Sequence, residues 1–232
     1  MPLWLQHPLD YAAGIPWLQL MIDSFWSLFS AGLTFTVPLA ILSFIGGLIV
    51  GFITALARLY APKPVKWLFD FYVWVIRGTP LLVQLFLIFY GLPSAGITLD
   101  AFPAALIGFT VSVGAYTSEI IRGAIMSVPK GQWEAAYSIG MSSSQAMRRV
   151  ILPQSVFVSL PPLSNSFISL IKDTSLAAVI TVPEMFLAAQ RIVSVTYEPL
   201  VLYVEAALIY LLFSTVLSKL QTRLEVYYRR YE

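Results

Sequence analysis

Charge is the scarcest property of this 232-residue chain, because only 11% of its residues are Asp, Glu, Lys or Arg. Soluble domains usually carry about 25% charged residues, whereas 58% of this chain is hydrophobic and its mean hydropathy is +0.79. A soluble globular protein is therefore excluded, and we expect an all-α, multi-pass membrane protein. The net charge of +2 is too small, and the basic residues are too scattered, to indicate a nucleic-acid partner.

Cysteine is absent, and histidine occurs once, as His7 near the N-terminus. Without cysteine the chain has no disulfide, no thiolate metal site and no cysteine nucleophile. The sequence also contains neither a G-x-S-x-G segment nor the phosphate loop G-x-x-x-x-G-K-[ST]. We therefore expect no catalytic site, no metal site and no ATP site on this chain.

Five apolar runs reach the length of about 20 residues that a membrane-spanning helix needs. These runs cover residues 24–57, 67–91, 101–125, 150–171 and 199–218. Pro153 and the pair Pro161–Pro162 predict a bend in the fourth helix. The segment 172–198 is apolar but interrupted by charges and a proline, so it is a re-entrant piece, an interfacial piece or a loop.

The positions of the basic residues predict the orientation of the five helices. With the N-terminus outside, the cytoplasmic loops and tail carry most of the Lys and Arg residues, as positive-inside topology requires. Only Lys172 and Arg191 then lie outside, beside acidic residues that include Glu184. We expect an N-terminal extracytoplasmic segment over 1–23, a transmembrane domain over 24–219 and a cytoplasmic tail over 220–232.

The longest polar stretch, residues 126–149, predicts two short helices joined at a glycine. Gly140 permits a left-handed turn, and Ser142 can cap the second helix. Ala135 and Ala136 offer a small surface that another protein can approach closely. The residues alone leave open a second interpretation, a solvated connecting loop without a partner.

The spacing within this stretch resembles the EAA loop of ABC importer permeases. Glu134-Ala135-Ala136, three residues, Gly140, nine residues and the segment from Val150 to Pro153 follow that pattern, with valine in place of isoleucine at 150. The resemblance implies a type I ABC importer permease fold whose cytoplasmic coupling helix inserts into the partner ATPase. It assigns the coupling role to Glu134, Ala135, Ala136, Gly140 and Pro153.

Three further segments resemble the polar amino acid subgroup of these permeases, and general similarity places the chain nearest to cystine importer permeases. They are residues 76–84, 115–122 and 163–176. The resemblance implies a multi-pass protein of the bacterial cytoplasmic membrane that works with a second permease subunit, either identical or a paralogue. The other implied partners are two cytoplasmic ATPase subunits, which bind ATP and Mg²⁺, an extracytoplasmic solute-binding protein, the amino acid itself and membrane lipid.

Polar residues inside the predicted helices are candidates for the solute path or for its scaffold, because such residues are costly in a bilayer. The candidates are Arg77, Gln84, Ser112, Tyr116, Glu119, Asn165, Ser169 and Lys172. Lys172, or the N-terminus of a broken helix, is the candidate partner for a solute carboxylate, and Glu119 is the candidate partner for its ammonium. The structural alternative is that Arg77 pairs with Glu119 or caps the helix broken at Pro80, and that Glu119 pairs with Arg122.

Two other functions compete with ATP-driven import. An ATP-independent secondary amino acid transporter or channel would favour an inverted repeat or a relay of charges through several helices. An intramembrane hydrolase would need a nucleophile and a base. Neither set of features is visible in the sequence.

Overall fold

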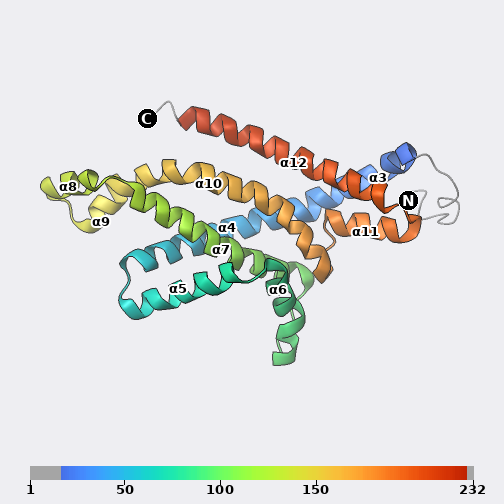
Figure 1. Cartoon of the computed structure of the whole chain (residues 1–232), viewed down its shortest axis with the longest axis horizontal. Helices are drawn as coiled ribbons and strands as arrows, with labels where there is room; N and C mark the ends of the chain where they lie inside the picture. The colour runs from blue at the N-terminus through green and yellow to red at the C-terminus, as the bar shows by residue number, and fades with distance from the viewer. Residues whose placement is uncertain (1–16, 229–232) are drawn as a thin grey trace. The chain divides into compact units, whose positions relative to one another are not determined.

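The structure is a computed structural model that describes the backbone of residues 17–228 and the side chains of residues 17–223 (Figure 1). His7 and the first 16 residues of the predicted N-terminal segment lie outside the described residues, as do residues 229–232 of the tail. Every regular element in the described part is a helix, which confirms the all-α expectation. Between residues 17 and 228, three helices are long and apolar enough to cross a membrane, and two bent helix pairs raise the number to five if each pair is one span.

The first span is a continuous helix from Trp17 to Tyr60 and begins earlier than predicted. It consists of α3 (Trp17–Ala31), the π-helical turn η1 (Gly32–Thr36) and α4 (Val37–Tyr60). Gly32 stands where a Cβ atom would lie 2.8 Å from Cε2 of Phe213. Glycine at this position therefore allows η1 to pack directly against a ring of the last helix.

The second span breaks where Pro80 predicts it. It comprises α5 (Lys63–Gly78), α6 (Leu81–Phe86) and the short turns η2 (Leu87–Gly91) and η3 (Leu92–Ala95). The chain bends by 105° at this break, because Pro80 supplies no N–H and disfavours helical geometry at the residue before it.

The remaining spans extend beyond their predicted limits. Helix α7 (Ala101–Ser127) leads into the polar loop, and η4 (Met147–Ile151) leads from that loop into α10 (Leu152–Asp173). Pro161 and Pro162 lie inside α10, which continues through both of them. The last helix, α12 (Pro199–Tyr228), continues through residues that the sequence places in the tail.

The segment after α10 is helical and largely buried. It forms η5 (Thr174–Ile180) and α11 (Met185–Thr196), and α11 is bent by 50° from the helical run Ser143–Ile180 that precedes it. Several of its side chains, among them Ile180 and Met185, are fully buried. The segment therefore contributes to the protein core, and Glu184, which the charge pattern places among the outer residues, is also fully buried.

The chain divides into two compact units. Unit 1 contains Met1–Leu42, Leu85–Leu106 and Ile168–Ser218. Its core joins α3, α11 and α12 through apolar side chains such as Leu28, Ile192 and Ile209.

Unit 2 contains Ser43–Gln84, Ile107–Phe167 and Lys219–Glu232. Here α4 and α7 approach closely at Gly47 and Gly51, where a Cβ atom would collide with Val113 and Thr117 respectively. The Thr117 hydroxyl donates to the Gly47 carbonyl at 3.1 Å. This tight contact holds together the two helices that carry three of the five members of the charge cluster described below, Arg58, Glu119 and Arg122.

Candidate functional site: elbow, charge cluster and cavities

The polar loop of unit 2 forms an elbow in which α8 (Lys130–Ser138) ends in a tight turn (Figure 1). The Gly140 N–H donates to the Tyr137 carbonyl at 2.9 Å, and the next N–H, that of Met141, donates to the carbonyl of Ala136 at 3.1 Å. This pair of bonds is the Schellman motif, which requires a left-handed residue after the helix. Gly140 has a φ of +81°, so the predicted left-handed turn is confirmed.

The second arm of the elbow is α9 (Ser143–Ala146), which begins with a reciprocal cap. The Gln145 N–H donates to Ser142 Oγ at 3.4 Å, and the Ser142 N–H donates to Gln145 Oε1 at 2.9 Å. The predicted cap at Ser142 is therefore confirmed. Both arms are thus defined by hydrogen bonds within the elbow itself.

An apolar cluster connects the elbow with the long helices of unit 2. Ile125 and Val128 at the end of α7 and Ile151 before α10 are buried together, and Trp133 of α8 and Met147 of η4 pack against them. A displacement of α8 therefore acts on both long helices through side-chain contacts.

The five predicted coupling residues differ in their exposure. Glu134 and Ala135 are exposed on α8, whereas Ala136 is only 3% exposed. Pro153 is exposed in the first turn of α10. Within the Glu-Ala-Ala triplet, only Glu134 and Ala135 thus face outward, while the methyl group of Ala136 packs inside the chain.

Substitution of Gly140 tests the need for a left-handed backbone at this position, because an added side chain would not clash with a neighbour. A Cβ atom at Gly140 would meet no atom within 4 Å, so any cost comes from the left-handed backbone alone. That cost is about 1–2 kcal/mol for an ordinary L-residue and smaller for asparagine. We expect Gly140→Val to reduce transport while Gly140→Asn retains most of it, measured as uptake per inserted protein. Wild-type uptake by both variants would show that the turn geometry is unimportant for transport.

Glu119 of α7 lies at the centre of a charge cluster in unit 2. Its Oε1 accepts a hydrogen bond from Arg58 Nη1 at 2.6 Å, and its Oε2 accepts one from Arg122 Nη2 at 2.7 Å. Arg77 Nη1 lies 3.6 Å from Oε1. The structure therefore brings Glu119 together with Arg77 and Arg122 as the structural alternative expected. An ammonium group at Glu119 would meet three guanidinium groups.

Sequence reasoning missed the contribution of Arg58 and Asp70 to this cluster. Arg58 Nε donates to Asp70 Oδ1 at 2.6 Å, and the Arg58 side chain is only 14% exposed. The two residues are twelve positions apart, on α4 and α5, so no helical spacing relates them. Only the tertiary fold shows that Arg58 joins α4 to both α5 and α7.

Gln84 caps the broken helix, a role for which the sequence makes Arg77 a candidate. Its Nε2 donates to the carbonyl of Ile76 at 2.8 Å and to Oγ1 and the carbonyl of Thr79 at 2.9 and 3.2 Å. Gln84 is 8% exposed. These contacts provide partners for backbone groups that lose their helical bonds at the break, which favours a scaffold role for Gln84.

The candidate residues Ser112 and Tyr116 of α7 lie in different environments. Ser112 is buried, whereas Tyr116 is 47% exposed. The guanidinium carbon of Arg77 lies 5.4 Å from the centroid of the Tyr116 ring, a cation–π geometry. Tyr116 thus belongs with the charge cluster, and Ser112 belongs with the packed interior of the unit.

The three candidates on α10 are all exposed, but only one lines a described cavity. Asn165 Oδ1 accepts a hydrogen bond from Gln221 Nε2 at 3.2 Å, which ties α10 to α12 in unit 2. Ser169 is exposed on the same helix. Lys172, near the end of α10, lines a cavity of about 490 Å³ in unit 1.

The cavity at Lys172 combines polar groups with aromatic walls. Its other lining residues are Ser175, Phe186, Tyr203, Ala206, Ala207, Tyr210, Leu211 and Ser214. The rings of Phe186 and Tyr203 lie 5.5 Å apart between centroids. A volume of this size is typical of small-molecule sites. Lysine offers a partner for a carboxylate, and the ring faces suit an ammonium group.

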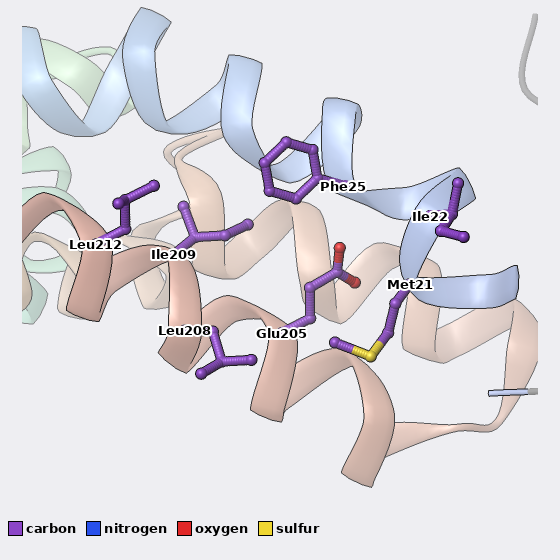
Figure 2. A pocket seen from close by; sticks show the side chains of 7 residues that line it. All are labelled: Met21, Ile22, Phe25, Glu205, Leu208, Ile209 and Leu212. Atoms are coloured by element: carbon purple, nitrogen blue, oxygen red, sulfur yellow. The ribbon is translucent and has the colours of Figure 1, made fainter. Parts of the chain in front are cut away.

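A second cavity in unit 1, of about 370 Å³, lies between α3 and α12 (Figure 2). Six of its seven lining residues are apolar, and the seventh is Glu205, which is 2% exposed. Ser24 Oγ donates to Glu205 Oε2 at 2.5 Å. Figure 2 shows the carboxyl group between the two helices. This cavity offers no cation to a carboxylate, so the cavity at Lys172 suits a zwitterionic solute better.

Comparison with known proteins places the chain in a family. Residues 47–230 match the family described as the inner membrane component of binding-protein-dependent transport systems. The L-cystine transport system permease protein TcyB of Bacillus subtilis is 54% identical over 224 residues, which are 96% of this chain and 95% of that protein. The glutamine transport system permease protein GlnP of Escherichia coli K12 is 36% identical over 218 residues, or 93% and 96% of the two chains.

A solved structure supports the same assignment. The crystal structure of an amino acid ABC transporter with histidines contains a chain that is 38% identical, with a TM-score of 0.85. The match covers 91% of this chain and 98% of that one. The expected ABC permease fold and membrane location are thereby confirmed. The chain belongs to the family of inner membrane components of binding-protein-dependent transport systems.

Proposed function

We propose that this permease subunit imports a polar amino acid, with L-cystine as the solute, across the cytoplasmic membrane. The observation that carries the proposal is the 54% identity with an L-cystine permease over nearly the whole length of both chains. The cavity at Lys172 supports the solute class, because it places a cation and aromatic faces around one volume.

The energy for import comes from a partner ATPase, because the sequence has no phosphate loop of its own. Two cytoplasmic ATPase subunits bind ATP and Mg²⁺ and receive the α8–α9 elbow, with the exposed residues Glu134 and Ala135 at the contact. Among the described residues, no group of three His, Cys, Asp or Glu side chains is placed to hold a metal ion.

The complete importer also contains a second permease subunit, either identical or a paralogue, and an extracytoplasmic protein that delivers the solute. The N-terminus lies outside and the C-terminus lies in the cytoplasm, an orientation that the distribution of Lys and Arg supports. In this orientation the elbow faces the ATPase.

Within the cavity, Lys172 binds one of the two carboxylates of L-cystine, and the rings of Phe186 and Tyr203 face an ammonium group of the solute. This arrangement replaces Glu119 as the ammonium partner, because Arg58 and Arg122 already occupy the Glu119 carboxylate. The charge cluster then serves as scaffold for α4, α5 and α7.

Lys172→Met tests the carboxylate contact. A hydrogen bond to a charged group contributes about 1.5–3 kcal/mol, so the apparent KM for L-cystine should rise about tenfold or more in proteoliposomes that contain the assembled importer. Arg191→Met is the matched control, since it removes a cation from α11 that does not line the cavity. An unchanged KM in Lys172→Met would remove this residue from the solute path.

A further inference from the structure

Glu184 is a fully buried carboxylate at the start of α11 that the coupling elbow and the charge cluster do not involve. Its two oxygens accept the backbone N–H groups of Phe186 at 2.9 Å and of Leu187 at 2.8 Å. A carboxylate at this place satisfies donors that the first turn of a helix leaves unpaired. These bonds fix the direction in which α11 leaves the preceding turn.

Two further hydroxyl groups reach the same carboxylate from other elements of unit 1. Tyr210 Oη of α12 donates to Glu184 Oε2 at 2.8 Å, and Thr36 Oγ1 of η1 lies 3.5 Å from that oxygen. The Met185 N–H in turn donates to Thr36 Oγ1 at 3.3 Å. One buried side chain therefore joins η1, α11 and α12.

Two of the residues that hydrogen-bond to Glu184 also line the cavity at Lys172. Phe186 and Tyr210 both line that cavity, and both hydrogen-bond to Glu184, one through its backbone and one through its hydroxyl. Thr36 does not line it. We propose that Glu184 is a positioning residue, which sets the shape of the solute cavity by holding the Tyr210 ring and the first turn of α11.

This inference rests on the proposed function, because it takes the Lys172 cavity as the solute site. A purely structural role would need only the helix cap and a stable core. The bond to Tyr210 is not needed for the helix cap, and it orients an aromatic ring that lines the solute cavity. Loss of that bond should affect solute affinity more than the amount of folded protein.

Tyr210→Phe removes the hydroxyl group and keeps the ring. We expect the apparent KM for L-cystine to rise about fivefold, the effect of one hydrogen bond, with a nearly unchanged maximal rate. Thr196→Val is the matched control, since it removes a buried hydroxyl of α11 that bonds to the Ile192 carbonyl and neither contacts Glu184 nor lines the cavity. Its KM should stay at the wild-type value. Glu184→Gln, which can still accept one N–H and donate to Tyr210 Oη, should give an intermediate KM.

The comparison with Lys172→Met separates the two proposals. An increased KM in Lys172→Met with a wild-type KM in Tyr210→Phe would overturn the positioning role and leave the solute site intact. Wild-type KM values in both variants would remove the cavity assignment and the positioning role together. If Tyr210→Phe does not insert, Glu184→Gln decides: an unchanged KM in that variant contradicts the proposal.

Discussion

Glu134→Lys is expected to abolish ATP-driven uptake while the chain remains inserted in the membrane. Glu134 is exposed on α8, in the Schellman-capped arm of the elbow, and α8 lies in none of the candidate spans. A reversed charge there should cost several kcal/mol against a partner surface that matches a carboxylate, without disturbing the fold. The measurement is uptake of labelled L-cystine together with the amount of ATPase that copurifies with the variant.

Glu198→Lys provides the matched control for Glu134→Lys. It makes the same charge reversal at an exposed glutamate outside the elbow, immediately before α12. This variant should retain both uptake and copurified ATPase. If Glu134→Lys also retained both, the elbow would not be the ATPase contact, and the coupling role of Glu134 would have to be abandoned.

Glu119→Gln is expected to destabilise unit 2 strongly. The substitution leaves Arg58 and Arg122 without the charge that they share, and removing one partner from a buried ionic contact costs about 3–5 kcal/mol. Because Glu119 keeps 22% side-chain exposure, we expect the lower end, about 3 kcal/mol. Thermal unfolding of the purified protein in detergent should show a midpoint lowered by about 6–12 °C.

Substitution of the arginines of the cluster should lower the unfolding midpoint by different amounts, which can be compared with Glu119→Gln. Arg77 lies 3.6 Å from Glu119 and its side chain is 44% exposed, so Arg77→Gln should cost less than about 1 kcal/mol. Arg58→Gln should cost clearly more, because Arg58 is 14% exposed and bonds to two carboxylates. Equal midpoints for Glu119→Gln and the wild type would contradict the scaffold role of the cluster.

The sequence was most informative where local rules decide the structure. Pro80 predicts the break of the second span, Gly140 the left-handed turn and Ser142 the cap of α9, and each depends on residues within a few positions. Apolar length likewise predicts where the spans lie, although helix ends extend beyond the apolar runs because helical hydrogen bonding does not stop at the first polar residue.

The rest of the site depends on contacts between residues far apart in the chain. Glu184 and Thr36 are 148 positions apart, and Arg58 and Glu119 are 61 positions apart. A charge count places Glu184 on the outer side of the membrane, but it cannot show that hydroxyl and backbone donors surround the carboxylate. For the same reason the sequence makes Glu119 a candidate partner for the solute ammonium, although its carboxylate accepts hydrogen bonds from Arg58 and Arg122 in the folded chain.

Accumulation of labelled L-cystine in reconstituted vesicles is the decisive measurement for ATP-driven import through this permease. The measurement uses proteoliposomes that contain this chain with its partner subunits and solute-binding protein, and parallel vesicles that contain this chain alone. We expect accumulation against a gradient only when the ATPase and ATP are both present. Accumulation or equilibration of L-cystine through the chain alone would contradict this expectation and would favour an ATP-independent transporter or channel.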